Sequence, residues 1–420
     1  MPRYTHLVNS MRSESAFTVL ARARALKASG KDVVELEIGD SPFPTTPAAK
    51  AAGIGAIEAN QTGYVSSLGI PEFRAAAARA VQSEFLVPAT AENVVAASGA
   101  KPFQQFFCEA FLEPDDAVLV FSPHFPTYEP NIARRGARMV IEPLRPERQF
   151  RPDPAAVARF IRGERKARSI WLNSPHNPTG GVATESDLAE IADLVRGTDI
   201  VIFSDEPYCH MVWNGARHHS ILAQPGMLER AVAAYTFSKS YSMSGWRIGF
   251  AVASAQTVQI LGGLINTAAS CSPPFVQVAA AAALDADREV RDQYMSAFES
   301  KVKWLAAGLS GIEGVVVAPP AGTFYVFPDV RGVCERLGLS SHGLAMFLLE
   351  AADDRFGVAC LGGECFGAAG AGFLRLSCAE ADDRIERAID FFPRAFARVD
   401  RARAFREAHP GYAWQPGSGA

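Results

Sequence analysis

Hydrophobic and polar positions alternate regularly between about residues 90 and 290 of the chain. Seven short apolar runs occur there, at residues 94–97, 117–121, 138–141, 169–172, 199–203, 231–237 and 248–252. Intervening segments, such as residues 103–112 and 185–195, carry apolar residues at helical spacing. Strands that alternate with helices are typical of βαβ units, and nearly continuous apolar strands are typical of a sheet buried on both faces. The pattern predicts an α/β fold whose large domain has a mostly parallel seven-stranded sheet sandwiched by helices.

The segments on either side of this region have a different pattern. It predicts a helix at residues 15–29, an apolar run at 33–38 and a long helix from residue 285 to 309. Further apolar runs at residues 315–318, 324–327 and 373–376 alternate with helical segments. We therefore expect the N- and C-terminal segments to form a smaller α+β domain. The expected units are an N-terminal segment (1–45) packing with the small domain, a large domain (46–290), a small domain (291–409) and a flexible tail (410–420).

Composition is typical of a globular protein and argues against several function classes. The 420 residues are 48% hydrophobic and carry a formal net charge of −4. This balance argues against a nucleic-acid partner, and no apolar run approaches the ~20 residues that cross a membrane. The seven cysteines lack the spacing of a disulfide framework, which predicts reduced thiols in a cytoplasmic protein. No cluster of His and Cys residues predicts a metal site.

Polar residues follow the apolar runs, and ligands of parallel sheets bind beyond the carboxyl ends of the strands. Lys239 follows the run at 231–237, and Arg247 directly precedes the run at 248–252. A lysine desolvated at a strand end can lose its proton and condense with an aldehyde. An arginine holds a phosphate by two parallel hydrogen bonds. The pair indicates a site for a phosphorylated aldehyde such as pyridoxal phosphate, although a single loop lysine is more often a solvated charge.

Three further runs end in groups that suit the same ligand. The turn at residues 98–101 precedes a helix, where free backbone N–H groups make an anion site. Phe125 follows the run at 117–121 and can stack on a flat heterocycle. Asn177 follows the run at 169–172 within Asn-Pro-Thr-Gly-Gly, whose prolines and glycines impose an unusual backbone path. Taken alone, the turn at 98–101 is better explained as a plain βα turn, and Phe125 as a side chain that covers the core. An ordinary loop, by contrast, does not need a run as rigid as the one that contains Asn177.

Asp205 and Tyr208 follow the run at 199–203. An unpaired buried carboxylate is costly, and a protonated pyridine nitrogen would pair with it and make the ring an electron sink. Tyr208 would reach a ring hydroxyl, whereas an aspartate that caps the next helix is the alternative for this motif alone. Five strand ends thus supply an anion site, a stacking ring, an amide, a carboxylate and a lysine–arginine pair. One shared pyridoxal phosphate site explains them better than five unrelated turns.

Three motifs carry a family resemblance that extends over nearly the whole chain. They are Asn177-Pro-Thr-Gly, Ser204-Asp-Glu-Pro-Tyr and Ser238-Lys-Ser-Tyr-Ser-Met-Ser-Gly-Trp-Arg. In this order and spacing, the sequence resembles the class I/II aminotransferases, which are fold-type I pyridoxal-phosphate enzymes similar to aspartate aminotransferase. The resemblance implies a transferase that moves an amino group from an L-amino acid to a 2-oxo acid by a ping-pong mechanism.

The resemblance also implies roles for individual residues. Lys239 would form the Schiff base with the cofactor and shuttle the proton, Asp205 would pair with the pyridine nitrogen, and Tyr208 would contact the 3-oxygen, as would Asn177. Phe125 would stack on the ring. The cofactor-binding residues that it implies within the subunit are Ser98, Gly99, Ala100, Lys101, Phe125, Asn177, Asp205, Tyr208, Ser238, Lys239 and Arg247.

Three more positions follow from the same resemblance. Tyr64 resembles the tyrosine that reaches the phosphate in the neighbouring subunit, which implies a homodimer with shared sites. Arg375, in Phe-Leu-Arg-Leu-Ser, resembles the arginine that binds the substrate α-carboxylate bidentately. Gly39 matches a backbone contact to that carboxylate, which Asn177 would also help to bind. No nucleic acid, membrane or metal is implied.

Some residues depart from the family pattern, and the substrate side chain is left open. Gly362-Gly-Glu-Cys-Phe366 replaces a segment that Pro-Gly precedes in many relatives, and Asp40-Ser-Pro-Phe43 replaces the commoner Glu-Pro-Asp. Lys101 would suit an acidic side chain or have a structural role. A β-lyase, an aminocyclopropane-carboxylate-synthase-like enzyme and an amino-acid oxidase or cyclase are alternatives on the same fold. A pyridoxal-phosphate-binding regulator is a more remote one, because such proteins carry an additional DNA-binding module.

Overall fold

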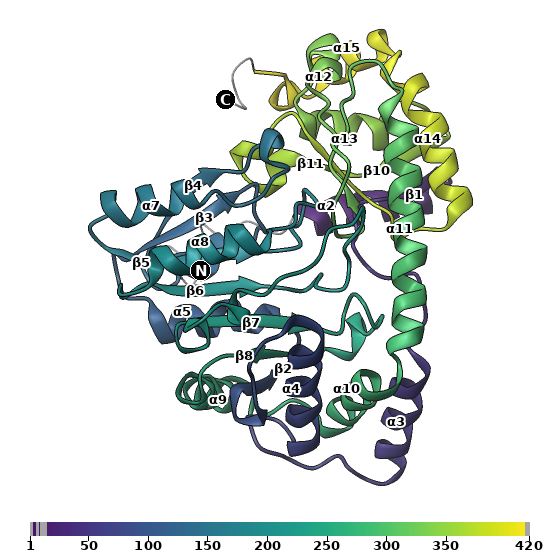
Figure 1. Cartoon of the computed structure of the whole chain (residues 1–420). Helices are drawn as coiled ribbons and strands as arrows, with labels where there is room; N and C mark the ends of the chain where they lie inside the picture. Colours follow the sequence, from purple (N-terminus) through teal and green to yellow (C-terminus); the bar gives the residue numbers. More distant parts are fainter. Residues whose placement is uncertain (1–2, 6–7, 9–14, 416–420) are drawn as a thin grey trace.

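We describe a computed structural model of the chain that covers residues 3–5, 8 and 15–415. Figure 1 shows a central sheet with helices around it and a second group of helices beside the long helix α11 (Arg288–Ser310). The sheet has seven strands in the order β2-β8-β7-β6-β5-β3-β4. Strands β4, β3, β5, β6 and β7 pair in parallel, whereas β8 is antiparallel to both β2 and β7. The predicted α/β fold with a mostly parallel seven-stranded sheet is confirmed.

Each strand of this sheet coincides with a predicted apolar run to within two residues at either end. The strands are β2 (Val94–Ala97), β3 (Ala117–Ser122), β4 (Arg138–Pro143), β5 (Ala167–Asn173), β6 (Val201–Asp205), β7 (Ala231–Thr236) and β8 (Gly249–Val252). In β2, β3 and β8 every residue is buried. Continuous burial explains why these strands lack the alternation of polar and apolar residues that a half-exposed strand shows.

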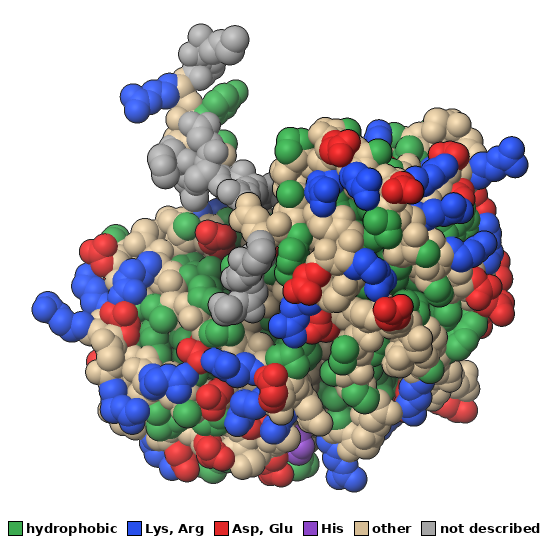
Figure 2. All heavy atoms as spheres, turned by 90° about the horizontal axis from the view of Figure 1, so that it is seen from above, with side chains coloured by type: hydrophobic (Ala, Val, Ile, Leu, Met, Phe, Trp, Pro, Cys, Tyr) green, Lys and Arg blue, Asp and Glu red, His purple; other side chains and the backbone are tan. Residues whose placement is uncertain are grey.

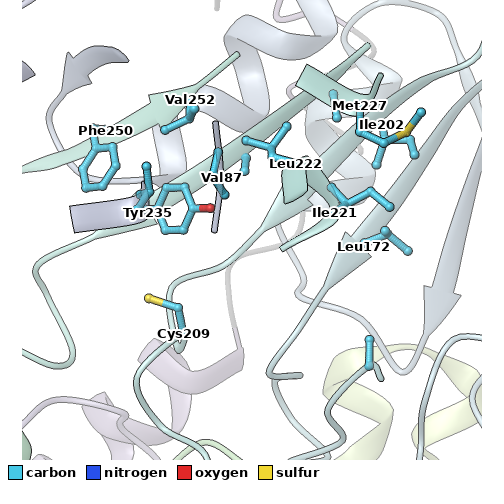
Figure 3. Close-up of a cluster of buried hydrophobic side chains, with 14 of the residues drawn as sticks. Val87, Leu172, Ile202, Cys209, Ile221, Leu222, Met227, Tyr235, Phe250 and Val252 are labelled. Atoms are coloured by element: carbon cyan, nitrogen blue, oxygen red, sulfur yellow. The ribbon is translucent and has the colours of Figure 1, made fainter. Parts of the chain in front are cut away.

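Helices cover both faces of the sheet. One face is covered by α4 (Pro71–Phe85), α7 (Pro154–Gly163), α8 (Glu185–Val195) and α10 (Pro274–Ala286), and the other by α5 (Lys101–Phe111), α6 (Tyr128–Ala133) and α9 (Ala255–Ala269). Adjacent strand residues point to opposite faces, so Ile202 packs in the first layer and Phe203 in the second. Figure 3 shows part of the first layer, where Leu222, Tyr235 and Phe250 gather beside the sheet.

A second hydrophobic cluster lies beside the long helix α11. It includes β1 (Asp32–Glu35), β9 (Tyr325–Val326), β10 (Phe356–Ala359), β12 (Leu374–Ser377), α12 (Arg331–Leu337), α13 (Ser341–Glu350), α14 (Asp382–Phe396) and α15 (Val399–Ala408). Strand β1 pairs in parallel with β10, and β12 pairs antiparallel with β9 and with β11 (Leu361–Gly362). Helix α2 (Ser15–Ala28) packs against this group through Val19 and Ala23. Residues near both ends of the chain therefore share one unit, while the exact domain boundaries stay a prediction.

Two local expectations from the sequence are wrong. Residues 315–318 do not form a strand and contribute only a single bridge, between Val316 and Asp329, because Pro319 and Pro320 follow and cannot donate backbone hydrogen bonds. The long helix expected from residue 285 is interrupted at Asp287, where α10 ends and α11 begins. Its carboxylate instead accepts hydrogen bonds from the backbone N–H groups of Ala48 and Ala49, both at 3.0 Å. These lie in the first turn of α3 (Pro47–Glu58), so a tertiary contact ends one helix and caps another.

Residues 410–414, which belong to the predicted tail, make specific contacts. Residues 410–412 form a 3₁₀ turn, and the Tyr412 ring stacks on Phe405 at a centroid distance of 5.9 Å. Trp414 donates its backbone N–H to the Gly338 carbonyl. Residues 416–420 lie outside the described part of the chain.

The surface of the molecule mixes both signs of charge. Figure 2 shows Lys and Arg side chains interspersed with Asp and Glu side chains on the face that it draws, so neither sign dominates there. Among the helices that the structure describes, none is both long and apolar enough to cross a bilayer.

The cap at Asp287 gives a stability prediction. Asp287→Ala removes two hydrogen bonds to a buried carboxylate at a helix N-terminus, and we expect the free energy of unfolding to fall by about 2–3 kcal/mol. The matched control is Asp285→Ala, because Asp285 pairs with Arg79 on the surface and should contribute at most about 1 kcal/mol. Urea denaturation at fixed protein concentration measures both. Equal losses in the two variants would contradict the capping role.

Candidate functional site

A cavity of 320 Å³ lies where the carboxyl ends of the sheet strands meet the second cluster. Its lining combines residues that follow β1, β2, β3, β5, β6 and β7 with side chains from β9 and β12. The predicted site residues that line it are Gly39, Ala100, Lys101, Phe125, Asn177, Asp205, Tyr208, Ser238, Lys239, Arg247 and Arg375. The structure thus brings together in one cavity groups that are up to 336 positions apart, from Gly39 to Arg375.

Asp205, the last residue of β6, places a carboxylate in the cavity. Its side chain is almost fully buried, and burial raises its pKa to about 6, although hydrogen bonds from Tyr128 and Gln104 act in the opposite direction. Both hydrogen bonds reach Oδ2, at 2.7 Å from the Tyr128 hydroxyl and 3.4 Å from the Gln104 amide. Among the described residues, Oδ1 has no hydrogen-bond partner. A cation in the cavity would therefore be strongly attracted to this carboxylate.

Lys239 approaches the cavity from the loop after β7. Its Nζ donates a 2.6 Å hydrogen bond to the Gly39 carbonyl and lies 6.0 Å from the ring centroid of Tyr208 and 5.7 Å from that of Phe324. Position 39 has room only for glycine, since a Cβ there would overlap the hydroxyl of Tyr325. The contact holds the amine beside two aromatic rings at the wall of the cavity.

An anion cradle forms where β2 meets α5. Gly99 has φ +91°, a conformation that residues with a side chain rarely adopt, and a Cβ there would lie 2.5 Å from Nη2 of Arg247. Arg247 itself has φ 56° and donates to the carbonyls of Ser244 at 2.7 Å and Ser98 at 3.1 Å. Ala100 precedes the first turn of α5, so the N-terminus of this helix and a guanidinium converge. This arrangement suits a phosphate or carboxylate.

Ser238 and Phe125 complete this part of the cavity. The hydroxyl of Thr236 donates to Oγ of Ser238 at 2.9 Å, which fixes the Ser238 side chain. The Phe125 ring packs edge-on against Tyr128 at 6.0 Å, and Nζ of Lys101 lies 5.2 Å from its centroid. An aromatic face is thus available next to the anion cradle.

Arg375 provides a second, deeper cation. The guanidinium is buried between the rings of Tyr325 and Phe366, at 4.3 and 4.9 Å from their centroids. Nη1 donates to Oδ1 of Asn177 at 3.2 Å and Nη2 donates to the Glu37 carbonyl, while Nε has no partner among the described residues. A buried, stacked guanidinium with fixed orientation is suited to bidentate binding of a carboxylate.

Tyr208 is buried beside this cation. Its hydroxyl lies 3.2 Å from the hydroxyl of Tyr325, and burial raises its pKa well above the ordinary value. The neutral phenol is therefore a hydrogen-bond donor over the whole physiological pH range.

Glu37 adds a carboxylate that the sequence did not single out. It lines the cavity with no exposed surface, and neither carboxylate oxygen has a hydrogen-bond partner among the described residues. Burial raises its pKa to about 7. Such a group is rare, because a buried charge without a partner is costly.

The remaining predicted residues lie outside the cavity lining. Ser98 and Gly99 belong to the anion cradle through their contacts with Arg247. Tyr64 is 91% exposed and does not contact the site of its own chain. No group of three or more His, Cys, Asp and Glu side chains in the described part of the chain is arranged to hold a metal ion.

Sequence reasoning missed Gln104, Tyr128, Tyr325 and Glu37. Gln104 lies one helical turn after Lys101, and Tyr128 lies three residues after Phe125, so the helical spacing of residues already singled out was an available signal. Tyr325 is the one hydroxyl within the apolar run at residues 324–327, and Glu37 is one of two acids, with Glu35, within the run at 33–38. A polar residue inside an apolar run marks a candidate for a buried site.

Comparisons with known proteins show which family of proteins this chain is similar to. The sequence profile described as aminotransferase class I and II matches residues 31–392. An aspartate aminotransferase of Pyrococcus abyssi (strain GE5 / Orsay) is 32% identical over 87% of this chain and 92% of its own length. A probable aspartate/prephenate aminotransferase of Aquifex aeolicus (strain VF5) is 34% identical over 93% of this chain and 98% of its own. A solved aspartate aminotransferase from Thermus thermophilus with maleate is 29% identical, with a TM-score of 0.87, and the match covers 94% of this chain and 100% of that one.

The buried Glu37 carboxyl predicts a pH dependence of stability. Its pKa is about 7 in the folded protein against 4.5 as the ordinary value, so between these pH values the folded state binds a proton that the unfolded state releases. Stability is therefore lost as pH rises from 4.5 through 7. Glu37→Gln should remove this loss and make the ligand-free protein about 3 kcal/mol more stable relative to wild type at pH 8 than at pH 4.5.

Urea denaturation at the two pH values measures this difference. Glu35→Gln is the matched control, because Glu35 is two residues earlier and pairs with Lys27 near the surface. We expect its effect to stay within about 1 kcal/mol at both pH values. A Glu37→Gln effect that is the same at pH 4.5 and pH 8 would show that the Glu37 carboxyl is not desolvated in the folded protein.

Proposed function

Because the chain belongs to the class I and II aminotransferase family, we propose that its cavity holds pyridoxal phosphate and an amino acid side by side. The protein is an aminotransferase, as are the relatives and the solved neighbours that it matches over most of its length. Pyridoxal phosphate is the general cofactor of this family. The observation that carries the proposal is that one lysine amine and one open buried carboxylate, Lys239 and Asp205, line the same cavity.

The residues present fit this cofactor in charge and shape. Oδ1 of Asp205 lacks a partner among the described residues and suits a protonated ring nitrogen. The cradle at Arg247 and the start of α5 suits the phosphate, and Phe125 offers an aromatic face between them. Tyr208 is a neutral donor for a ring oxygen, with Asn177 nearby. Each polar group of pyridoxal phosphate thus has a complementary group in the cavity.

The chemistry is divided between the cofactor and the chain. Pyridoxal phosphate, when bound, supplies an aldehyde that takes up the substrate amino group and a protonated ring that accepts the electrons of the Cα–H bond. Asp205 keeps the ring nitrogen protonated, because neutralising that nitrogen would leave the buried carboxylate without a counter-charge. Tyr128 and Gln104 hold this carboxylate in place through Oδ2.

Lys239 moves the proton in this proposal. Once released from the cofactor, the Lys239 Nζ would take the proton from the substrate Cα, hold it, and deliver it to the carbon that carried the cofactor aldehyde. The hydrogen bond to the Gly39 carbonyl shows that the amine can reach the side of the cavity next to Arg375. One residue therefore serves first as the covalent anchor and then as general base and acid.

Arg375 fixes the substrate by its α-carboxylate. The Asn177 amide and the Glu37 carbonyl orient the guanidinium, and the two stacked rings exclude water from it. Held at this carboxylate, an L-amino acid has its Cα within reach of Lys239. A 2-oxo acid carries the same carboxylate group. The amino acid and the 2-oxo acid would therefore both bind to Arg375, each in its own half-reaction of the ping-pong mechanism.

We further propose a homodimer in which Tyr64 completes the site of the partner subunit. The Tyr64 side chain is 91% exposed, which is unusual for a tyrosine in a well-packed protein, and it follows α3, where Ile54 and Ile57 are also half exposed. Large exposed apolar side chains that occur so close together in the sequence are consistent with an interaction surface. Packing of this surface against a second copy would cover it and place a phenol at a shared site.

The lysine assignment gives a direct kinetic prediction. Lys239→Ala should reduce transamination by at least about 10⁴-fold, because both the covalent anchor and the proton carrier are removed, while pyridoxal phosphate still binds weakly. Stopped-flow absorbance of the bound cofactor measures the half-reaction with each amino donor. Lys166→Ala, an exposed lysine paired with Asp115, is the control and should retain wild-type rates. Near-normal turnover in Lys239→Ala would reject the assignment.

The subunit-sharing proposal predicts an effect on cofactor affinity. Tyr64→Phe removes only a hydroxyl, and its loss from a phosphate contact should weaken pyridoxal phosphate binding by about tenfold. Fluorescence titration measures the affinity, and sedimentation velocity measures the oligomeric state. Tyr4→Phe, a second exposed tyrosine, is the control. A protein that sediments as a monomer, or an unchanged affinity in Tyr64→Phe, would contradict the shared site.

A further inference from the structure

A buried hydrogen-bond network links the loop that carries Lys239 to two helices outside the cavity. Arg291, near the start of α11, donates to both carboxylate oxygens of Glu84 in α4, at 2.9 Å each. Oε2 of Glu84 is 2.7 Å from Nε2 of His210, and Nδ1 of His210 is 3.1 Å from the hydroxyl oxygen of Ser240. Ser240 directly follows Lys239 in the sequence. The proposed reaction leaves this network without a task.

The contacts of His210 define its hydrogen-bond roles. Burial lowers the pKa of His210, although the hydrogen bond with Glu84 acts in the opposite direction, so the imidazole is neutral at physiological pH and carries one N–H. A carboxylate only accepts, so the 2.7 Å contact with Glu84 requires that proton on Nε2, even though Nη1 of Arg291 is also 3.0 Å from this nitrogen. Nδ1 is left as an acceptor, and the Ser240 hydroxyl donates to it. Sγ of Cys209, a weaker donor, lies 3.5 Å from the same nitrogen.

The surroundings of the His210 ring restrict its movement. The ring packs against Phe85 and Tyr241 at centroid distances of 5.5 and 6.0 Å. The side chains of Arg291 and Glu84, which hold its other face of hydrogen bonding, are only 3% and 12% exposed. Hydrogen bonds to charged groups are stronger than neutral ones, and they gain further strength where water is excluded. His210 therefore presents a fixed acceptor to the lysine loop.

Lys239 depends on such anchors because it lies in a turn rather than in the sheet. Strand β7 ends at Thr236, three residues before the lysine. On one side of Lys239, the Ser238 hydroxyl is held by Thr236 at 2.9 Å, and on the other side the Ser240 hydroxyl is held by His210. A lysine side chain has many rotamers, so the position of its backbone decides which atoms the amine can reach. A displacement of about 1 Å at a reacting group can lower a rate by about 100-fold.

We propose that His210 is a positioning residue, which holds the Lys239 loop through the Ser240 hydroxyl so that the amine reaches both the cofactor carbonyl and the substrate Cα. The inference rests on the proposed function, since it takes Lys239 as the residue that binds the cofactor and moves the proton. Glu84 and Arg291 act one step further away, because they fix the tautomer and the orientation of His210.

Two substitutions at position 210 separate the hydrogen bond to the loop from the one to Glu84. In His210→Asn the side-chain oxygen can take the place of Nδ1 and accept from Ser240, whereas the shorter side chain does not reach Glu84. In His210→Gln the amide N–H can take the place of Nε2 and donate to Glu84, but no acceptor is left for Ser240. Ser240→Ala removes the hydroxyl itself. Ser300→Ala, at an exposed serine of α11, is the control.

The first test measures formation of the covalent bond rather than turnover. Full-length protein freed of cofactor is mixed with pyridoxal phosphate, reduced with borohydride after increasing times, and analysed for the pyridoxyl group on Lys239. We expect labelling about tenfold slower than in wild type in His210→Gln and Ser240→Ala, and within about twofold of wild type in His210→Asn and Ser300→Ala. Pyridoxine phosphate has the same ring and phosphate but an alcohol in place of the aldehyde, so its affinity should stay within about twofold in every variant.

The second test follows proton transfer in the loaded enzyme. Stopped-flow absorbance measures the half-reaction with the fastest of aspartate, tyrosine and alanine, each with hydrogen or deuterium at Cα. We expect the maximal rate to fall about tenfold in His210→Gln and Ser240→Ala, and the half-saturating donor concentration to stay within about threefold because Arg375 is unchanged. The deuterium effect should be at least as large as in wild type, since proton transfer is the step that is slowed. The double variant should be no more than about twofold slower than either single variant, because both remove one interaction.

The outcomes separate a positioning role from a structural one, with urea denaturation giving the stability of each variant. Rates that fall in His210→Asn as far as in His210→Gln, in step with lost stability, would show that His210 only supports the fold. Wild-type labelling rates in His210→Gln or Ser240→Ala would also overturn the inference. If wild-type protein is not labelled at Lys239, or no donor reacts, the proposed function fails and the inference fails with it. Slow labelling in His210→Gln and Ser240→Ala, with normal labelling in His210→Asn, supports the positioning role.

Discussion

Two groups that line one cavity, the Asp205 carboxylate and the Lys239 amine, are the constraint on which the site depends. Asp205 ends a strand buried on both faces, where an ionised carboxylate is costly, and only Oδ2 receives hydrogen bonds from described residues. The amine is held 2.6 Å from the Gly39 carbonyl among aromatic rings. A ligand that binds the Lys239 amine covalently and presents a cation to the Asp205 carboxylate would satisfy both groups at once. The other groups that line the cavity would position that ligand.

The fold explains how residues from distant parts of the chain come together. The carboxyl ends of β5, β6 and β7 lie at one edge of the sheet, so Asn177, Asp205 and Lys239 become neighbours. The second cluster pairs β1 with β10 and β12 with β9, which brings the segment around Gly39 next to Arg375. The residues proposed to bind the cofactor thus lie at the edge of the sheet, whereas Arg375, proposed to bind the substrate, lies in the second cluster. The cavity lies between them.

Much of this arrangement is predictable from the sequence, and the exceptions have physical causes. Continuous burial makes strands such as β2, β3 and β8 visible as apolar runs. The rule that ligands bind at strand ends is enough to select Asp205 and Lys239. The break at Asp287 was not predictable, because the bonds that cause it go to Ala48 and Ala49, far away in sequence. The contact of Tyr128 with Asp205 is equally non-local. The proposed roles of Tyr64 at a shared site and of Arg375 in binding the substrate α-carboxylate rest on family resemblance.

The central claim is that the Lys239 amine is the group that binds the cofactor covalently. The most direct measurement is borohydride reduction of the protein after incubation with pyridoxal phosphate, followed by tryptic digestion and mass spectrometry. We expect one peptide spanning residues 231–247 that carries the pyridoxyl group and is uncleaved at Lys239. A protein that remains unmodified, or whose pyridoxyl group is found on other lysines while residues 231–239 appear as an unmodified peptide, would contradict it.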